Sequence, residues 1–207
     1  MRKKNEISFF YRSKYEKVIL LSFFGMVQKI VLIGLRGSGK SHFGSLIAQD
    51  FGWNHIDLDK QIEMNEGKKI SEIIAEKGWD YFREKEYEAC KAVENAQNLV
   101  ISTGGGAICF ERNVPFLKKN AFTVLLFSQL EDLVERLERS KDRPPLTRAA
   151  TLTEEVKMMW AERKDTYFKE ADLVFKAQKV LPHAVRNVEY NATILANRIK
   201  KEIHFVS

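Results

Sequence analysis

The pattern GLRGSGKS at Gly34–Ser41 constrains this chain more than any other feature, because it has the G-x-x-x-x-G-K-S spacing of a phosphate-binding loop. The apolar run Ile30–Ile33 precedes it and is typical of a buried parallel strand. Ser41–Asp50 follows with apolar residues at helical spacing, and Gly52 is placed to end that helix. The glycines therefore lie between a strand and a helix, where such a loop must be.

The chemistry of this loop follows from its residue types. Glycines allow backbone conformations in which several N–H groups point at one phosphate, and the helix N-terminus adds partial positive charge. Lys40 is expected to reach the β- and γ-phosphates, and the hydroxyl of Ser41 is expected to coordinate Mg²⁺. The competing interpretation is a glycine-rich turn without a ligand, which the full pattern disfavours.

Composition indicates one globular domain and excludes several classes of protein. The 207 residues are 44% hydrophobic and 30% charged, enough to bury a substantial core. Two cysteines and four scattered histidines argue against a disulfide framework or a structural zinc site, and fit a reducing cytosol. The net charge is +6, of which six Lys/Arg and two Asp/Glu in Met1–Gly25 supply +4. A nucleic-acid-binding role for the whole chain therefore has little support.

Residues 1–25 are interpreted as an extension outside the fold, with residues 26–207 forming the single domain. The apolar run Val18–Phe24 is far shorter than the ~20 residues that span a bilayer, and no small-x-small cleavage site follows it. Met26 is the expected start. A tail that binds a membrane surface or a partner protein is the alternative.

Two aspartates follow the second expected strand, His55–Leu58. Strand alternation would place Asp57 and Asp59 on the same side, at the carboxyl end that faces the ligand crevice of an open α/β sheet. Two carboxylates there suit Mg²⁺ and a substrate hydroxyl. A solvated turn with an aspartate helix cap is the alternative.

The next segment is expected to be helical. Lys60–Glu76 has the pattern of two short helices, the second capped by Ser71, and Trp79–Ala96 has that of a longer one after Gly78. Arg83 on the longer helix has Glu86 at i+3, which is placed to hold its guanidinium. Taken alone, such an arginine is usually a solvated surface residue.

Three consecutive glycines, Gly104, Gly105 and Gly106, come directly after the apolar strand Leu99–Ser102. Their entropic cost is explained by a close backbone approach to a ligand, whereas a loose loop is the alternative. No acidic residue ends this strand, which leaves metal organisation to Ser41 and Asp57.

The second half continues the alternation of strands and helices. Segment 140–150, SKDRPPLTRAA, is charged and broken by prolines, so it is expected to be a mobile surface loop. Arg143 and Arg148 flank the prolines and suit a lid over phosphates, whereas a solvated basic loop is the alternative. The other expected elements are the strands Thr123–Phe127 and Leu173–Phe175 and the helices Leu130–Arg139 (with Arg136), Leu152–Glu170 (with Arg163 and Tyr167) and Leu181–Glu202.

The ordered motifs together resemble the shikimate kinases, from about Lys29 to Asp172. They are the phosphate loop, Asp57-x-Asp59, Phe82-Arg83-Glu84-x-Glu86, the glycine triplet, Arg143-Pro144-x-Leu146 and Arg163-x-x-x-Tyr167. The resemblance implies an α/β fold: a three-layer α/β/α P-loop kinase with a five-stranded parallel sheet in the order 2-3-1-4-5 and a mobile lid. It implies ATP-dependent phosphorylation of the 3-hydroxyl of shikimate to shikimate 3-phosphate, towards chorismate and the aromatic amino acids. A cytoplasmic monomer without nucleic-acid or stable membrane partners is expected.

The resemblance also implies roles for individual residues. Lys40, Asp59 and Arg143 would be catalytic, and Asp59 would contact the reacting hydroxyl. Mg²⁺ would be held by Ser41 and, through water, by Asp57. ATP would be bound by Gly37, Ser38, Gly39, Lys40, Ser41, His42, Arg136, Arg143 and Pro182. Shikimate would be bound by Asp59, Arg83, Gly104, Gly105, Gly106 and Arg163, within a substrate-binding region of about 59–97.

Three departures from the family pattern are visible. The lid reads Arg-Pro-Pro-Leu where Arg-Pro-Leu is more usual, His42 stands where Thr is common, and the segment before Pro182 does not align cleanly. The rival functions are a P-loop kinase for gluconate or a nucleoside monophosphate, and an ATP-binding regulator without catalysis. The paired arginines favour a carboxylate substrate, and retention of Lys40 and Asp59 disfavours an inactive regulator.

Overall fold

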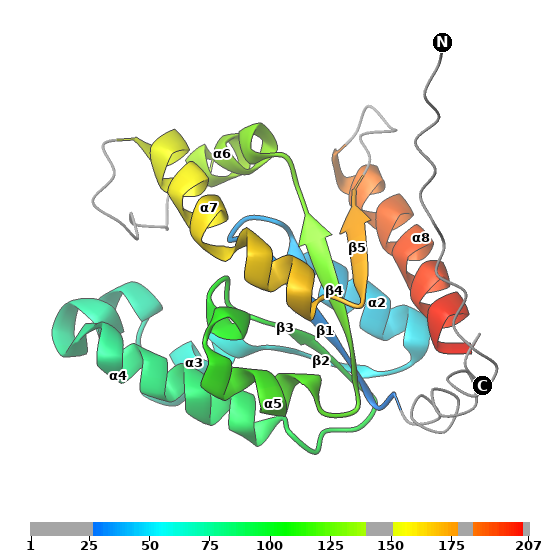
Figure 1. The fold of residues 1–207 in the computed structure, drawn as a ribbon, viewed down its shortest axis with the longest axis horizontal. Helices are drawn as coiled ribbons and strands as arrows, with labels where there is room; N and C mark the ends of the chain where they lie inside the picture. Colours follow the sequence, from blue (N-terminus) through cyan, green and yellow to red (C-terminus); the bar gives the residue numbers. More distant parts are fainter. Residues whose placement is uncertain (1–26, 140–150, 178–183, 205–207) are drawn as a thin grey trace, which may run out of the picture.

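Strand β1 (Lys29–Ile33) is the central strand of a five-stranded parallel sheet. It pairs with β3 (Leu99–Ser102) on one side and β4 (Ala121–Phe127) on the other. The outer strands are β2 (Asn54–Asp57), next to β3, and β5 (Leu173–Lys176), next to β4. The computed structural model describes residues 27–139, 151–177 and 184–204 (Figure 1). The order β2-β3-β1-β4-β5 confirms the expected 2-3-1-4-5.

The sheet is buried on both faces, as its apolar strands require. All five residues of β1 are inaccessible to solvent, which is typical of a parallel strand covered by helices on both sides. Ile30 and Leu32 belong to one hydrophobic cluster, and Val31 and Ile33 belong to another, because successive side chains point to opposite faces.

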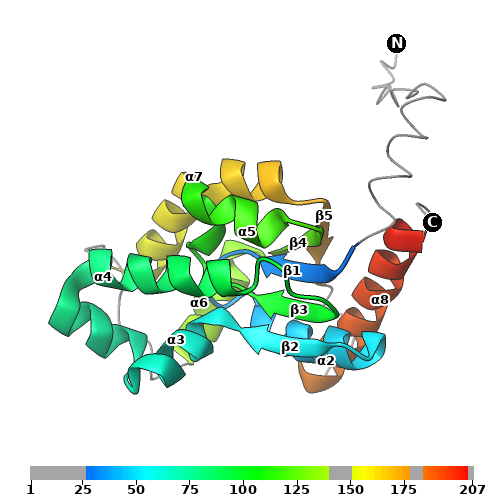
Figure 2. The ribbon, with the colours of Figure 1, turned by 90° about the horizontal axis from the view of Figure 1, so that it is seen from below.

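Helices form the two outer layers. Helices α2 (Lys40–Phe51) and α8 (Ala184–His204) pack together and cover one face of the sheet. Helices α4 (Ile70–Ala92), α5 (Val114–Lys118) and α7 (Leu152–Glu170) cover the other face (Figure 2). The described part also contains α3 (Leu58–Glu66), α6 (Leu130–Glu138) and short 3₁₀ turns at Ala107–Cys109 and Glu111–Asn113.

The second strand ends one residue earlier than its sequence pattern predicts. Asp57 is the last residue of β2 and also caps α3, since its side chain accepts a hydrogen bond from the backbone N–H of Lys60. Asp59 lies in the first turn of α3. The expectation that strand alternation aligns the two aspartates was therefore wrong, although both still lie at the carboxyl end of the sheet.

Helix α4 joins segments that the sequence pattern separates. Gly78 has φ 81° and ψ 172°, which makes a kink where an interruption was expected. The helix starts at Ile70, and its first turn is closed by Glu72, whose carboxylate accepts the N–H of Lys69 at 2.8 Å. Ser71 therefore lies inside the helix and is not its cap. The helix ends at Ala92 rather than at the predicted Ala96.

Lys29 ties two helix ends to the sheet. This fully buried side chain donates hydrogen bonds from Nζ to the carbonyl oxygens of Val93 (2.8 Å), Glu94 (2.8 Å) and Phe116 (2.7 Å). Burial lowers the pKa of Lys29 to about 8. Two carbonyls directly after α4 and one within the short α5 thus gain a partner that lies in β1.

Candidate active site

The phosphate loop has the shape that its glycines predict. Gly34, Gly37 and Gly39 have φ of 136°, 83° and 95°, in the region that side chains disfavour. Nζ of Lys40 lies 2.9 Å from the carbonyl oxygens of both Gly34 and Leu35, so the lysine folds back over the loop that precedes it. Helix α2 begins at Lys40, which aims its first backbone N–H groups into the loop.

Ser41 and Asp57 meet at the mouth of this loop. The Ser41 hydroxyl donates a hydrogen bond to a carboxylate oxygen of Asp57, across the gap between α2 and β2. A hydroxyl and a carboxylate are hard oxygen ligands, which Mg²⁺ prefers, and Mg²⁺ typically uses one or two protein oxygens together with phosphates and waters. Among the described residues no group of three or more His, Cys, Asp or Glu could hold a metal, so a protein-only metal site is not indicated there.

Asp59 has an unusual electrostatic environment. Burial raises its pKa to about 6, and the neighbouring carboxylates of Asp57 and Glu86 act in the same direction, whereas Lys40 opposes them. This arrangement gives the carboxyl a proton affinity suited to accepting a proton near neutral pH.

Arg83 is oriented by a buried carboxylate and by aromatic rings. Its Nη1 lies 2.8 Å from Oε2 of Glu86, whose side chain is only 2% exposed. The guanidinium carbon lies 4.4 Å from the ring centre of Phe110 and 5.1 Å from that of Trp79. The predicted support of Arg83 by Glu86 is confirmed. Burial raises the pKa of Glu86, an effect that Arg83 opposes.

The glycine triplet is the point where these side chains converge. A Cβ at Gly104 would lie 2.5 Å from Oδ1 of Asp59, and one at Gly106 would lie 3.1 Å from Nη1 of Arg83. A Cβ at Gly105 would lie 3.7 Å from Nη1 of Arg163, which reaches the triplet from α7. A side chain at Gly104 would therefore require a shift of Asp59, and side chains at Gly105 and Gly106 would be in tight contact with the backbone N of Arg36 (3.2 Å) and with Arg83.

Tyr167 fixes α7 against the triplet. Its hydroxyl donates a hydrogen bond to the carbonyl oxygen of Gly105, and its side chain is fully buried. Burial raises the pKa of Tyr167 well above its usual value, so it remains a donor. The i, i+4 spacing therefore serves two purposes on one face of α7, because Arg163 points at the site and Tyr167 anchors the helix.

The predicted nucleotide residues are only partly within the described structure. Nη1 of Arg136 lies 3.3 Å from the carbonyl oxygen of Gly37, which brings the middle of the phosphate loop and α6 together. His42 is exposed in the first turn of α2. Arg143, Arg148, Pro182 and the segment 140–150 lie outside the described residues.

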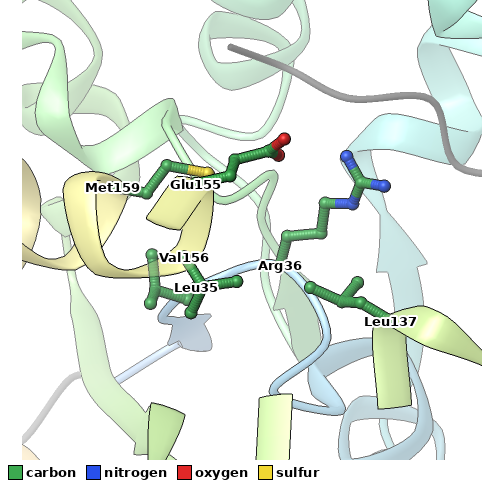
Figure 3. Close-up of a pocket in the computed structure, with 6 residues that line it drawn as sticks. All are labelled: Leu35, Arg36, Leu137, Glu155, Val156 and Met159. Atoms are coloured by element: carbon green, nitrogen blue, oxygen red, sulfur yellow. The ribbon is translucent and has the colours of Figure 1, made fainter. Parts of the chain in front are cut away.

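Sequence reasoning missed a charged pair of residues beside the loop. Arg36, Glu155 and four apolar side chains line a small hollow between the phosphate loop, α6 and α7, and the charged ends of Arg36 and Glu155 lie on the same side of it (Figure 3). Glu155 is 4% exposed although it lies in the first turn of α7. The sequence pattern does not predict the burial of Glu155, because glutamate is common in the first turn of a helix.

Comparisons with known proteins agree on one family. A family model described as shikimate kinase matches residues 36–195. A shikimate kinase of Sulfurihydrogenibium sp. is 37% identical over 159 residues, covering 77% of this chain and 93% of that protein, and one of Aquifex aeolicus is 36% identical over 160 residues with the same coverage. The solved structure of shikimate kinase from Acinetobacter baumannii in complex with shikimate has a TM-score of 0.75 at 27% identity, covering 88% of this chain and 96% of that chain.

Proposed function

The chain belongs to the shikimate kinase family and is an ATP-dependent kinase of shikimate, and we propose that it transfers the phosphoryl group to the 3-hydroxyl with the residues gathered around its phosphate loop. The product is shikimate 3-phosphate, which leads towards chorismate and the aromatic amino acids. The single observation that carries the residue assignment is the convergence of Asp59, Arg83 and Arg163 on the glycine triplet, next to Lys40.

We propose that the two arginines bind the carboxylate of shikimate. Arg83 and Arg163 lie on α4 and α7, and both act on the buried Glu86, so their positive charges share one small region. A guanidinium binds a carboxylate through paired charge-assisted hydrogen bonds. Glu86 already holds one edge of Arg83, which fixes the direction of the remaining donors. The backbone at Gly104, Gly105 and Gly106 would lie beside the ring.

Asp59 would accept the proton of the reacting hydroxyl. Its raised pKa, near 6, leaves it ionised at neutral pH and close enough in proton affinity for transfer. With the carboxylate of shikimate held at one end, the hydroxyl at the other is presented to the γ-phosphate. Phosphoryl transfer then depends mainly on positioning and on charge, and Lys40 supplies positive charge at the β- and γ-phosphates.

The donor set fits Mg²⁺, with Ser41 as a direct ligand and Asp57 acting through water. The hydrogen bond between these two side chains supports this assignment, because it places the two oxygens next to each other. When bound, Mg²⁺ supplies charge that offsets the negative charge of the phosphates.

The remaining nucleotide contacts are proposed from the family resemblance. Gly37, Ser38, Gly39 and His42 would line the phosphates, and Arg136 and Pro182 would flank the adenine. Arg143 would act from a lid over 140–150, outside the described residues.

A monomer in the cytoplasm, where ATP is available, is the proposed state, and residues 1–25 are proposed to lie outside the domain formed by 26–207. No helix in the described part of the chain has the length and apolar character of a membrane span.

Phosphorus NMR of the purified chain with ATP, Mg²⁺ and separate acceptors tests the function directly. Shikimate should give a new phosphate-ester signal, whereas gluconate and nucleoside monophosphates should give none above background. Lys40→Met should reduce the rate by ~10²–10³, the usual effect of losing one donor to developing charge. Transfer to gluconate or a nucleotide in preference to shikimate would contradict the proposal, and so would ATP binding without transfer.

A further inference from the structure

A chain of side-chain hydrogen bonds joins β2 and β3 to the start of α2, on the side of the phosphate loop that faces the sheet. Nε2 of His55 lies 2.9 Å from Oγ of Ser102, and Oγ of Ser102 lies 2.8 Å from the carbonyl oxygen of Lys40. Ser102 is 1% exposed and His55 is half-buried. Neither residue belongs to the motifs that indicate the function.

The direction of these hydrogen bonds follows from the proton count. A serine hydroxyl has one proton, and the contact with a carbonyl oxygen requires that Ser102 donate it to Lys40. The same hydroxyl must then accept from His55, whose ring therefore carries a proton on Nε2. The chain runs from the imidazole N–H through the hydroxyl to the backbone of Lys40.

Gly44 leaves room for His55 and Ser102 beside α2. It lies inside α2, one turn after Lys40, where glycine lowers helix stability relative to alanine. A Cβ at Gly44 would collide with Nε2 of His55 and would lie 2.5 Å from Oγ of Ser102. The absence of a side chain at this position is therefore explained by the two polar groups that pack against the helix backbone.

These hydrogen bonds also hold the backbone of Lys40. The side chain of this residue is held by the carbonyl oxygens of Gly34 and Leu35, and its backbone carbonyl is held by Ser102. The next residue, Ser41, contacts Asp57, which lies two positions after His55 on the same face of β2. Strand β3 thus holds Lys40 through Ser102, and β2 holds the next residue, Ser41, through Asp57.

We propose that His55 and Ser102 are positioning residues that fix the backbone of Lys40, and with it the lysine and the amide groups that bind the phosphates of ATP. This inference rests on the proposed function of the phosphate loop. In this proposal His55 acts on the carbonyl of Lys40 through the hydroxyl of Ser102.

Three variants test the proposal by steady-state kinetics well below their melting temperatures. His55→Phe keeps an aromatic ring without a donor, Ser102→Ala removes the link, and His55→Gln keeps a side-chain N–H. The first two should lower kcat/KM for ATP by roughly 2–10-fold, the effect of one neutral hydrogen bond, and should leave the KM for shikimate unchanged. His55→Gln should recover part of the loss. The double variant, which combines His55→Phe with Ser102→Ala, should be no worse than Ser102→Ala alone.

Asn191→Ala is the matched control, because it removes another buried side-chain hydrogen bond, from Nδ2 to the carbonyl oxygen of Asn187 in α8. It should lower the melting temperature without changing kcat/KM for ATP. The proposal is overturned if His55→Phe and Ser102→Ala behave like this control, or if their effects on ATP are additive. A wild-type chain that does not phosphorylate shikimate would instead contradict the proposed function.

Discussion

Asp59 is the proposed proton acceptor, and its raised pKa implies a cost in stability. Its pKa is raised to about 6 in the folded protein, against 3.8 for an unperturbed aspartate. The folded state therefore binds more protons than the unfolded state between these values, and the free energy of unfolding falls as pH rises through that window. Asp59→Asn removes this penalty. Without nucleotide or metal, the variant should be more stable than the wild type by ~1–3 kcal/mol at pH 7.5, and the difference should vanish below about pH 4.

The matching measurements are urea unfolding at several pH values and turnover at pH 7.5. Asp59→Asn should lose ~10²–10⁴ in kcat, since it cannot accept the proton of the hydroxyl. Asp80→Asn is the control, because Asp80 is an exposed residue on α4, and it should change neither quantity appreciably. If Asp59→Asn is less stable than the wild type at neutral pH, the ionised carboxylate stabilises the fold and the predicted penalty is wrong.

Replacing Arg83 or Arg163 should weaken the use of shikimate as a substrate. Hydrogen bonds to a charged group contribute ~1.5–3 kcal/mol, so Arg83→Ala or Arg163→Ala should lower kcat/KM for shikimate by roughly 10–150-fold. The affinity for ATP should barely move. Lysine replacements should recover little, because an ammonium group does not reproduce the planar fork that Glu86 orients.

Two controls separate substrate binding from general damage. Arg139→Ala removes an arginine whose side chain is 74% exposed, and it should have no effect on shikimate kinetics. A shikimate analogue without its carboxylate should be a poor substrate for the wild type and should respond far less to either mutation. The double mutant should deviate from additivity, because both arginines are proposed to hold one carboxylate. Normal phosphorylation of shikimate by both single mutants would contradict the assigned site.

At the scale of elements, the glycine triplet follows β3 and packs closely against side chains of α3 and α4. Gly104→Ala would place a methyl group 2.5 Å from Oδ1 of Asp59 and 3.2 Å from Oε1 of Glu86. Glu86 is held by Arg83, and Asp59 is proposed to contact the reacting hydroxyl, so we expect a large fall in kcat/KM for shikimate together with some loss of stability. Gly52→Ala is the control for a glycine replacement without a clash, since Gly52 has φ 65° and nothing lies within 4 Å of a Cβ built there. It should cost about 1 kcal/mol of stability without changing activity. Equal activity losses in both variants would show that the triplet is not a special contact.

The elements also show what the sequence could and could not predict. Strands with buried apolar runs, such as β1 and β3, and the helix Leu152–Glu170 were predicted closely because period and burial agree there. Strand β2 was misplaced by one residue, because Asp57 ends a strand and caps a helix at once. The short α5 was missed altogether, since five residues are too few to show helical periodicity.

The site was predictable where a local motif encodes it and not where tertiary contacts create it. Lys40, Ser41 and the glycine triplet follow from spacing alone, whereas Arg83 reads as a surface charge until Glu86 and Phe110 are seen around it. His55 and Ser102 belong to separate strands, so only the fold brings them together. Lys29, which begins an apolar strand, gave no sign that it would bind three carbonyls from distant helices.

At the scale of the whole molecule, strand order explains where chemistry gathers. The central β1 delivers the phosphate loop, and its neighbour β3 delivers the glycine triplet at the same edge of the sheet. The outer β2 brings Asp57 and Asp59 next to both. The carboxyl ends of parallel strands share one edge, so residues from these three separate stretches meet there. Helix α7 then closes the site from above the sheet with Arg163.

The last prediction concerns where this molecule begins as a folded unit. The family match starts at residue 36, and the first described backbone contact is from the N–H of Gln28 to the carbonyl oxygen of Asn120 at 2.9 Å. A chain that begins at Met26 keeps this contact and Lys29. It should therefore have the melting temperature and kcat/KM of the full chain, within ~1 °C and twofold. Removing residues 1–25 takes away +4 of the +6 net charge, so retention on a cation exchanger should fall.

A chain whose first native residue is Ile30 is the matched comparison, because it differs by four further residues and lacks Lys29. The carbonyl oxygens of Val93, Glu94 and Phe116 then lose their common donor in a buried place. A buried group left without its hydrogen bond costs ~1–3 kcal/mol, and three such groups represent a large part of the stability of a domain. We expect this chain to melt many degrees lower or to fail to fold. If the chain starting at Met26 also loses several degrees in differential scanning calorimetry, residues 1–25 pack on the domain and the boundary at Met26 is wrong.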